Sequence, residues 1–344
     1  MNISIDFFLR ILALSFFHPS FVLIFLPYFY SIGYGLTTPE FFWASIYTSI
    51  VCFFWLLGYL SLKSRNGWKT IKTNWDDEVV VVTGGSGGVG GLLTETLAIR
   101  NVTVIILDVN PPEIEHVNVE YFQCDVSNYE EVQRVGKDII EQFGSPTILV
   151  NNAAIVRGKT ILDESIRDIT DTINTNLLSS FWTTKVFLPD MIKNNHGHIV
   201  TVASSLGYTG LPQLADYCAS KAALISFHES LRYELDTRYD AKQVRTTLVC
   251  PGEIETGLFD GIKVSFPFIT PRLAPLDVVK LIVTALDKNE GHIITTPYYV
   301  YLMSLLRFLP SFIQDLVHKV FIYLYLLQLL NDRIINAKIS AFNL

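Results

Sequence analysis

The sequence predicts an α/β fold: a doubly wound parallel sheet, preceded by a hydrophobic membrane segment and followed by an amphipathic helical region. Between residues 76 and 296, runs of four to seven Val, Ile and Leu residues alternate with amphipathic helical patterns. Such runs indicate strands buried on both faces of a parallel sheet. The two ends of the chain are far more apolar. Only 17% of all residues are charged, against about 25% in ordinary soluble domains.

Residues 1–62 form the predicted membrane anchor. They contain three charged residues, Asp6, Arg10 and Glu40, and residues 41–62 contain none. As a helix, those 22 residues would be about 33 Å long, enough to cross a hydrocarbon core of about 30 Å. The apolar region is too long for a cleaved signal peptide and lacks a small-residue cleavage site after a basic start.

A basic linker, residues 63–75, follows the anchor, and its Lys and Arg residues favour a cytosolic location for the rest of the chain. The first apolar run, residues 7–35, is interrupted by Pro19 and Pro27. It fits a second membrane span, an interfacial helix or one arm of a hairpin. A hairpin that enters and leaves on the same face would also suit the monolayer of a lipid droplet.

The end of the chain, residues 297–344, is apolar again but carries scattered charges, among them Arg307, Asp315 and Lys319. Between residues 311 and 321, polar side chains fall on one side of a helix and apolar ones largely on the other. This pattern fits a helix in the membrane interface, a lid over an apolar substrate entrance, or a helix packed against the core.

A glycine-rich turn joins the first predicted strand, residues 78–83, to a helix. Gly84, Gly88 and Gly90 form this turn. Glycine lets the backbone bend sharply and lets a pyrophosphate approach the N-terminus of the helix, where N–H groups favour anions. The strand, the turn, the helix and an acidic residue that ends the next strand together predict a Rossmann-type dinucleotide site.

Asp108 is that acidic residue. Its carboxylate can accept hydrogen bonds from both hydroxyls of the adenosine ribose and would repel a 2′-phosphate. Neither the glycine turn nor Val109 supplies a Lys or Arg to neutralise such a phosphate, so we expect NAD rather than NADP. Asp125, after a third strand at residues 119–123, is placed to hydrogen-bond the adenine amino group. Asn151 closes the fourth strand near the same cofactor.

Tyr217 and Lys221 lie four residues apart in the segment YCASK, which puts both side chains on one face of a helix. Oxidation of an alcohol needs a base for the hydroxyl proton, but a free tyrosine, with a pKa of about 10, is too weak a base at neutral pH. A nearby ammonium and the positive nicotinamide ring favour the phenolate, so we expect them to lower that pKa. Lys221 can also hydrogen-bond the nicotinamide ribose.

Two further polar residues complete the predicted catalytic set. Ser204 lies 13 residues before Tyr217, at the end of a predicted strand, where its hydroxyl can hold the substrate oxygen. Asn176 lies in a helical segment that it can bend, and it can hold a water for proton relay to Lys221. No metal site is expected, because the four cysteines are dispersed without a CxxC pair. A net charge of −7 without a Lys/Arg run argues against nucleic-acid binding.

These motifs resemble those of the short-chain dehydrogenase/reductase family. TGGSGGVG matches the family's TGxxxGxG, and NNAA approximates its NNAG, with Ala154 in place of the usual glycine. The tetrad of that family is matched in order and spacing by Asn176, Ser204, Tyr217 and Lys221. The resemblance covers about residues 76–295.

The resemblance also implies cofactor contacts. In PGEIET, Thr256 would contact the nicotinamide carboxamide and Ile254 its ring. The other residues that the resemblance assigns to the cofactor site are Ser86, Val89, Val126, Asn152 and Pro251.

The segments NLLSSFWTTKVFLPDM, GHIVTVASSLGYTGLPQLADYCASKAAL and LRFLP are similar to those of membrane- and lipid-droplet-associated retinol and 17-beta-hydroxysteroid dehydrogenases. That branch implies a lipophilic alcohol as substrate, such as a retinoid, a steroid or a long-chain alcohol. It also implies a location at the endoplasmic reticulum, the lipid droplet or both, and homodimers are common in the family. The apolar loop 257–275 fits a hydrophobic substrate pocket, but its sequence does not identify the ligand.

Two alternatives to an NAD-dependent alcohol dehydrogenase stay open. An NADPH-dependent membrane carbonyl reductase of lipid synthesis, of the 3-keto sphingoid type, would share the anchor and the tetrad, but Asp108 counts against it. A non-catalytic lipid-droplet scaffold would keep the nucleotide fold, and the intact tetrad counts against that.

Overall fold

The structure is a computed structural model that describes residues 4–68, 72–258 and 270–320. The chain divides into two compact units, Met1–Thr70 and Ile71–Leu344. Most of the predicted substrate loop (259–269) and the end of the predicted C-terminal region (321–344) lie outside the described residues.

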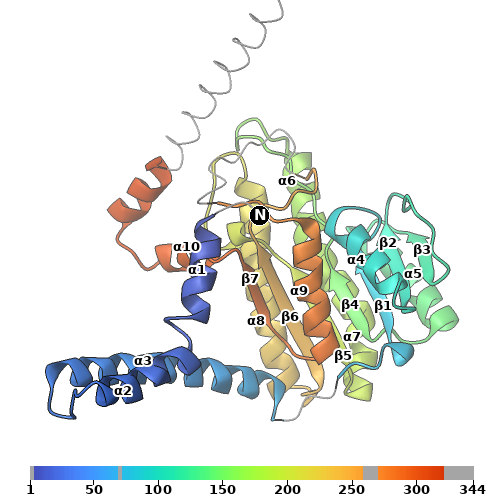
Figure 1. Cartoon of the computed structure of the whole chain (residues 1–344). Helices are drawn as coiled ribbons and strands as arrows, with labels where there is room; N and C mark the ends of the chain where they lie inside the picture. Colours follow the sequence, from blue (N-terminus) through green and yellow to red (C-terminus); the bar gives the residue numbers. More distant parts are fainter. Residues whose placement is uncertain (1–3, 69–71, 259–269, 321–344) are drawn as a thin grey trace, which may run out of the picture. The chain divides into compact units, whose positions relative to one another are not determined.

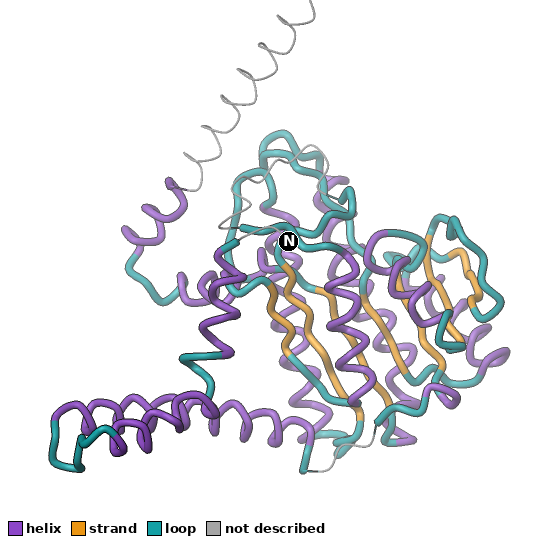
Figure 2. The backbone as a smooth tube through the Cα atoms, in the orientation of Figure 1, coloured by secondary structure: helices purple, strands orange, loops and turns teal. Residues whose placement is uncertain are grey.

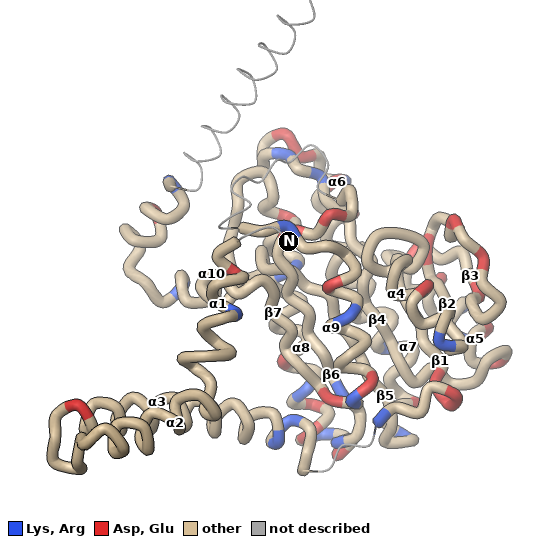
Figure 3. The backbone as a smooth tube through the Cα atoms, in the orientation of Figure 1, with Lys and Arg blue, Asp and Glu red and all other residues tan. Residues whose placement is uncertain are grey.

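The first unit consists of three apolar helices: α1 (Ile5–Leu14), α2 (Pro19–Ser31) and α3 (Pro39–Asn66). α3 is long and apolar enough to cross a membrane, as the sequence predicts, and α1 and α2 reach that length only as a pair bent by 55°. Figure 3 shows that α2 and α3 carry almost no charge, apart from the basic residues near the C-terminal end of α3. A proline in its first turn begins α3, and Gly67 at φ 73° ends it.

α2 and α3 pack against each other, and three side chains of α3 hydrogen-bond main-chain carbonyls of the preceding segment. Trp55 Nε1 donates to Phe17 O at 2.8 Å, Tyr47 Oη to Phe16 O at 2.5 Å, and Thr48 Oγ1 to Val22 O at 3.3 Å. Phe16 and Phe17 lie in the break between α1 and α2, so two of these bonds satisfy carbonyls outside a helix, which matters in an apolar environment.

The second unit is built on a sheet of seven parallel strands in the order β3-β2-β1-β4-β5-β6-β7 (Figures 1 and 2). The strands are β1 (Val79–Thr83), β2 (Thr103–Asp108), β3 (Val119–Gln123), β4 (Ile148–Asn151), β5 (Gly197–Val202), β6 (Val244–Pro251) and β7 (Ile293–Thr296). The order reverses between β1 and β4, and a crevice at such a point is where doubly wound sheets bind ligands.

Helices cover both faces of this sheet. α4 (Gly88–Ala98) and α9 (Pro275–Lys288) pack on one face, and α5 (Tyr129–Phe143), α7 (Ser179–Asn194) and α8 (Ala215–Thr237) pack on the other. Successive strand residues alternate between the two resulting cores: Val80 and Val82 lie in the first, and Val81 lies in the second. The predicted doubly wound α/β fold is therefore confirmed.

The fourth strand ends where the sequence predicts, and one further strand was not predicted. β4 ends at Asn151. Its continuation stops because Thr83 Oγ1 accepts the N–H groups of Asn152 and Ala153, at 2.9 and 3.0 Å, in place of a ladder partner. β7 was not predicted, because four residues next to a Gly-His turn give too short an apolar run to read as a strand.

The predicted helix around Asn176 is interrupted. α6 (Ile166–Ile173) continues into η2 (Asn174–Leu178), a π-helical turn, and then into α7. π-helical turns are frequent at functional sites, and this one lies where the sequence predicts that Asn176 disturbs the helix.

The segment before β1 is fixed to the second unit, although the linker was predicted to extend to residue 75. Trp75 Nε1 donates to Asp287 Oδ1 at 2.8 Å, and Arg100 Nη1 donates to the same oxygen at 2.8 Å. The Thr73 N–H donates to the main-chain carbonyl of Asp287 at 3.3 Å. The catalytic unit thus begins before the first strand, at the C-terminal end of α9.

Candidate active site

A cavity of about 750 Å³ lies where the C-terminal ends of the strands meet, within the range of about 300–1,000 Å³ that is usual for ligand pockets. It is lined by most of the predicted site residues: Gly84, Ser86, Gly88, Val89, Asp108, Asp125, Val126, Asn152, Ser204, Tyr217, Lys221, Pro251, Ile254 and Thr256. Among the predicted residues, Gly90, Asn151 and Asn176 do not line it.

The glycine turn between β1 and α4 forms one wall of the cavity. Gly84 at φ 62° and Gly88 at φ 56° adopt the left-handed backbone that favours glycine. Gly87 caps α4 without a side-chain hydrogen bond, and a Cβ added there would meet open space. The first turn of α4 therefore presents N–H groups to the cavity, which is the arrangement that binds a pyrophosphate.

Gly90 lies in the first turn of α4 and not in the turn itself, which corrects the prediction. A Cβ on Gly90 would collide with the carbonyl oxygen of Gly84 and with Asn152 Nδ2. Asn152 Nδ2 itself donates to the carbonyls of Thr83 and Gly84, at 3.1 Å each. The role of Gly90 is thus to let α4 approach β1 closely, while Asn152 holds the turn from the other side.

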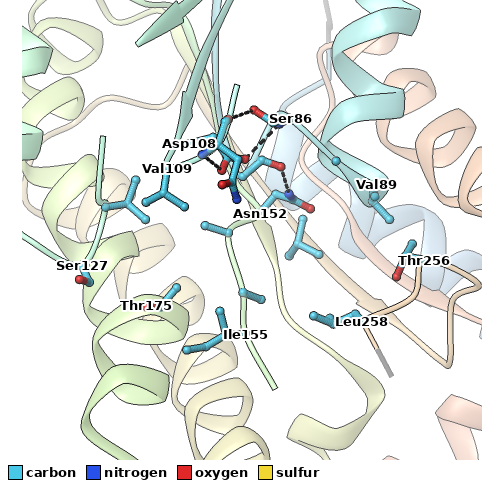
Figure 4. Close-up of a pocket in the computed structure, with 18 of the residues that line it drawn as sticks. Ser86, Val89, Asp108, Val109, Ser127, Asn152, Ile155, Thr175, Thr256 and Leu258 are labelled. Atoms are coloured by element: carbon cyan, nitrogen blue, oxygen red, sulfur yellow. Dashed lines mark hydrogen bonds between the residues drawn. The ribbon is translucent and has the colours of Figure 1, made fainter. Parts of the chain in front are cut away.

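Asp108, at the end of β2, is held at the edge of the cavity by main-chain donors (Figure 4). Its Oδ2 accepts the N–H of Ser86 and its Oδ1 that of Asn110, both at 3.1 Å. The Ser86 hydroxyl donates to Asn110 O at 2.6 Å, so the glycine turn and the end of β2 are locked together. Each carboxylate oxygen keeps acceptor capacity toward the cavity.

Asn151 does not belong to the cavity, and its neighbour Asn152 does. Asn151 is buried in β4, where its Oδ1 accepts the Thr183 hydroxyl at 2.7 Å. Strand residues alternate between the faces of a sheet, so Asn151 points to α7 and only the residue after the strand reaches the site.

The catalytic hydroxyls come from the ends of β5 and α8. Ser204 follows β5 and begins η3 (Ser205–Gly207), where its Oγ accepts the N–H of Leu206 at 3.2 Å. Tyr217 and Lys221 lie in the first turns of α8, and the hydroxyls of Ser204 and Tyr217 are hydrogen-bonded to each other. All three are buried, so the site joins them as the sequence predicts.

Lys221 lies beneath the Tyr217 ring, with Nζ 5.6 Å from the ring centroid. The same Nζ donates to the carbonyl of Val202, the last residue of β5, at 2.9 Å. An ammonium has three donors, so this bond fixes Lys221 and leaves capacity toward the cavity. Burial lowers the pKa of Lys221 to about 8.

Burial and hydrogen bonding act in opposite directions on the pKa of Tyr217. Burial raises it above its ordinary value, and this outweighs the opposing effect of the hydrogen bond with Ser204. The desolvation of the phenolate outweighs the effect of an ammonium that lies 5.6 Å from the ring centroid. The lowering expected from Lys221 and the nicotinamide ring together thus depends on the positive charge of that ring and stays a prediction.

Asn176 stands behind the cavity, in the π-helical turn. Its Oδ1 accepts the N–H of Ile155 at 2.7 Å, and its Nδ2 donates to Ile155 O at 2.9 Å and to Ser220 Oγ at 3.3 Å. Asn176 therefore ties α8 to the loop after β4, whose residues Ala154 and Ile155 line the cavity.

Several lining residues were not singled out from the sequence. They are Val109, Asn110, Glu113, Ser127, Arg157, Arg167, Asp171, Thr175, Gly252 and Leu258. Some directly follow a predicted residue, as Val109 follows Asp108, so the ends of the strands were a usable signal. Arg157, Asp171 and Thr175 come from the loop after β4 and from α6 and η2, where no motif marks them.

The residues present fit a nicotinamide dinucleotide. An uncapped helix N-terminus, a glycine turn open at Gly87 and the carboxylate of Asp108 form one end, and the Ser204–Tyr217–Lys221 group forms the other. A Cβ added to Gly88 would lie 3.6 Å from Thr256 Cβ, so the loop after β6 lies opposite the glycine turn. Figure 4 shows Val89, Thr256 and Leu258 along this side of the cavity.

Comparison with known proteins agrees with this site. Residues 78–264 match the short chain dehydrogenase family. The chain is 46% identical over 179 residues to "Dehydrogenase RED2" of Cochliobolus heterostrophus, covering 51% of this chain and 68% of that protein. It is 35% identical to human "Epidermal retinol dehydrogenase 2", over 70% of this chain and 80% of that one.

A third relative is "Estradiol 17-beta-dehydrogenase 11" of Mus musculus, which is 37% identical over 71% of this chain and 84% of its own length. The region that matches the family holds strands β1 to β6, the glycine turn and the Ser204–Tyr217–Lys221 group. The chain therefore belongs to the short-chain dehydrogenase family, in its retinol and 17-beta-hydroxysteroid dehydrogenase branch, and is an oxidoreductase that acts on alcohols.

Proposed function

We propose that this protein is an NAD-dependent dehydrogenase of a lipophilic alcohol, such as a retinoid, a steroid or a long-chain alcohol. The observation that carries the proposal is the buried Ser204–Tyr217–Lys221 group, which shares one cavity with the glycine turn and Asp108. The names of two relatives, a retinol and an estradiol dehydrogenase, support the class of substrate.

Each residue of the group has a role in this proposal. Ser204 and Tyr217 hold the substrate oxygen between their hydroxyls, and Tyr217 Oη takes the hydroxyl proton during oxidation or returns it during reduction. Lys221 stabilises the phenolate and binds the nicotinamide ribose, and Asn176 supports proton relay through the α8 side of the site. The nicotinamide, when bound, exchanges the hydride with the carbinol carbon.

We propose NAD as the cofactor because the adenosine end of the cavity is acidic. Asp108, Glu113 and Asp125 all line the cavity, and carboxylates there would repel a 2′-phosphate. Val126 and Ser127 complete the wall at which the adenine would lie, with Asp125 toward its amino group.

We also propose that the chain is attached to a membrane, with the catalytic unit on the cytosolic side of the endoplasmic reticulum or on a lipid droplet. The support is α3 with its basic C-terminal end and the apolar surface of the C-terminal segment. Whether α1 and α2 add a second span or an arm of a hairpin is decided by labelling single cysteines placed in residues 32–38 from either side of a sealed vesicle. The homodimer that is common in the family would be measured by light scattering.

A screen of alcohols tests the function. Full-length protein in nanodiscs is given NAD with retinol, estradiol or hexadecanol, and NADH fluorescence is followed. We expect turnover of at least one of them and loss of that turnover in Tyr217→Phe. Binding of NAD without turnover of any would favour the scaffold alternative and overturn the proposal.

One observation favours a second candidate, an NADPH-dependent carbonyl reductase of lipid synthesis. Burial raises the pKa of Tyr217, which favours the protonated form that donates to a carbonyl oxygen. The acidic adenosine end opposes this candidate. Titration with NADH and NADPH separates the two, because tighter binding of NADPH would contradict the role given to Asp108.

A further inference from the structure

The C-terminal segment returns to the catalytic site after β7. Arg307, at the end of α10 (Tyr299–Leu306), donates from Nε to Tyr208 O at 2.8 Å and from Nη2 to Gly207 O at 3.3 Å. Both carbonyls belong to the turn that begins at Ser204. A guanidinium with two hydrogen bonds in a planar fork fixes direction as well as distance.

This turn is in direct contact with the catalytic helix. A Cβ added to Gly207 would lie 2.9 Å from the carbonyl oxygen of Lys221 and 2.6 Å from Ile225 Cδ1, so only glycine allows the turn to pack there. The N–H of Gly207 donates to Ser204 O at 3.0 Å. Arg307 therefore hydrogen-bonds the end of the turn that begins at Ser204. The same turn packs against the backbone of Lys221.

A second contact joins the same segment to the opposite wall. A Cβ on Gly252, which follows Pro251 at the cavity, would collide with Tyr299 Oη and lie 2.9 Å from Pro297 Cδ. The segment 297–307 thus contacts both the Ser204 turn and the loop after β6. A movement of this segment would therefore displace both walls of the site.

The segment also presents an apolar surface, which we define as Leu302, Leu305, Phe308 and Phe312. Their exposed fractions are 59%, 54%, 85% and 69%. Residues 298–306 contain no charged side chain. Exposed apolar surface of this kind marks a site of interaction with a membrane or a partner.

We propose that Arg307 is a positioning residue for Ser204 and Lys221, and that it makes their geometry depend on the seating of this apolar surface in a phospholipid layer. The proposal rests on the membrane attachment proposed above. It adds a means by which lipid contact is transmitted to the catalytic group.

A phospholipid layer is the occupant because the chain carries its own apolar helix. α3 is long enough to span a bilayer, which supplies such a layer wherever the protein resides. The apolar surface is followed by Asp315 and Lys319, as in helices that lie in the interface with a polar face outward. Phe308 is next to Arg307 in the chain, so insertion of Phe308 into the lipid would act on the two hydrogen bonds of Arg307, which we call the Arg307 clamp.

Hydrogen exchange tests the clamp without any substrate. We compare full-length wild type and Arg307→Met in phosphatidylcholine nanodiscs, reading the amides of residues 206–208. We expect exchange there to be at least about tenfold faster in Arg307→Met, because two charge-assisted hydrogen bonds are lost. Arg307→Lys, which keeps the charge, is expected to lie between the two, and Lys319→Met, which removes an exposed cation from the same segment, to match wild type.

Activity then tests the positioning role. With the alcohol that wild type turns over best among retinol, estradiol and hexadecanol, we expect kcat of Arg307→Met to fall at least about tenfold, with the Kd of NADH changed less than twofold. Unchanged exchange and unchanged kcat would overturn the proposal. If wild type itself oxidises no alcohol, the proposed function fails, and the exchange data still decide on the clamp.

Two measurements test the lipid. Tryptophan fluorescence of Phe308→Trp is expected to be quenched by brominated phosphatidylcholine beyond the quenching of wild type. Phe308→Ser is expected to speed exchange at residues 206–208 in wild type and to add nothing in Arg307→Met, because the two act through one contact. Absence of extra quenching, or protection that rises with protein concentration at fixed lipid, would overturn the lipid assignment, the latter in favour of a second copy of the chain.

Discussion

The two ends of the cavity are built on different principles. At the nucleotide end the contacts come from the main chain and from a partly buried carboxylate: the turn Gly84–Gly88, the first turn of α4, and Asp108. At the catalytic end, Ser204, Tyr217 and Lys221 are side chains buried to at least 94%. Recognition is thus supplied by backbone shape, and reactivity by desolvation of titratable groups.

This difference predicts how each end fails. A change of shape at the nucleotide end should remove binding, whereas a change of chemistry at the catalytic end should remove turnover and leave binding intact. Mutations that separate these two outcomes test whether the division is real.

The largest expected effect is that of Tyr217→Phe. It removes the only proposed proton donor and acceptor at the substrate oxygen while keeping the ring, so kcat should fall by about 10³-fold or more, within the usual range for general acid–base groups. The Kd of NADH, measured by fluorescence, should change less than about twofold. A comparable loss of NADH affinity would show that the two ends are not separable.

Gly90→Ala tests the nucleotide end. The added methyl collides with the Gly84 carbonyl and with Asn152, and backbone cannot yield as a flexible side chain can. We expect NADH affinity to fall by about tenfold to 100-fold, since the turn shifts against the pyrophosphate. Gly210→Ala is the control, because its Cβ would also meet open space but Gly210 does not line the cavity. Equal losses in the two variants would contradict this account.

The nucleotide end was predictable from motif spacing, and two residues were misplaced there. Gly90 belongs to the helix, because the glycine pattern records where backbones touch and not where the helix begins. Asn151 was misassigned for a similar reason: the strand ends at Asn151, and alternation turns its side chain to Thr183. A local sequence pattern predicts which segment lies at the site. A shift of one residue along the strand then decides to which face of the sheet a side chain points.

The catalytic end was predictable in its members but not in its energetics. The spacing of Tyr217 and Lys221 gives proximity, yet the sign of the Tyr217 pKa shift depends on burial by segments far away in the chain. Arg307 lies in the segment LRFLP, which resembles the family branch, but nothing in that segment marks a role for the arginine. Its role depends on α10 returning to the Ser204 turn 99 residues away, a contact that only the folded chain contains.

Cofactor choice is a smaller effect at the nucleotide end. Asp108→Asn keeps the size and the acceptor oxygen but removes the charge, so we expect the preference for NADH over NADPH to narrow by about tenfold. The measurement is the ratio of the two Kd values. Glu113→Gln removes a carboxylate that lines the same cavity without an assigned ribose contact, and it should alter the ratio less. A larger change of this Kd ratio in Glu113→Gln than in Asp108→Asn would show that Asp108 is not the main determinant of cofactor preference.

The smallest expected effect is a pH dependence at the catalytic end. Burial lowers the pKa of Lys221 to about 8 from 10.5, while that of Tyr217 is raised. Between pH 7 and 9 Lys221 is therefore the member of this pair that changes charge, and Tyr217 stays a phenol. Loss of the ammonium makes that phenol a weaker acid. For reduction of a ketone, kcat/KM should then fall as pH rises through about 8, by about two- to fivefold.

Lys221→Arg separates this cause from others. A guanidinium stays protonated across the range, so the decline near pH 8 should vanish from the pH profile even though the absolute rate is lower. NADH binding confirms that the variant is folded. If the decline persists in Lys221→Arg, another group sets it, and burial of Lys221 is not what tunes the catalytic end.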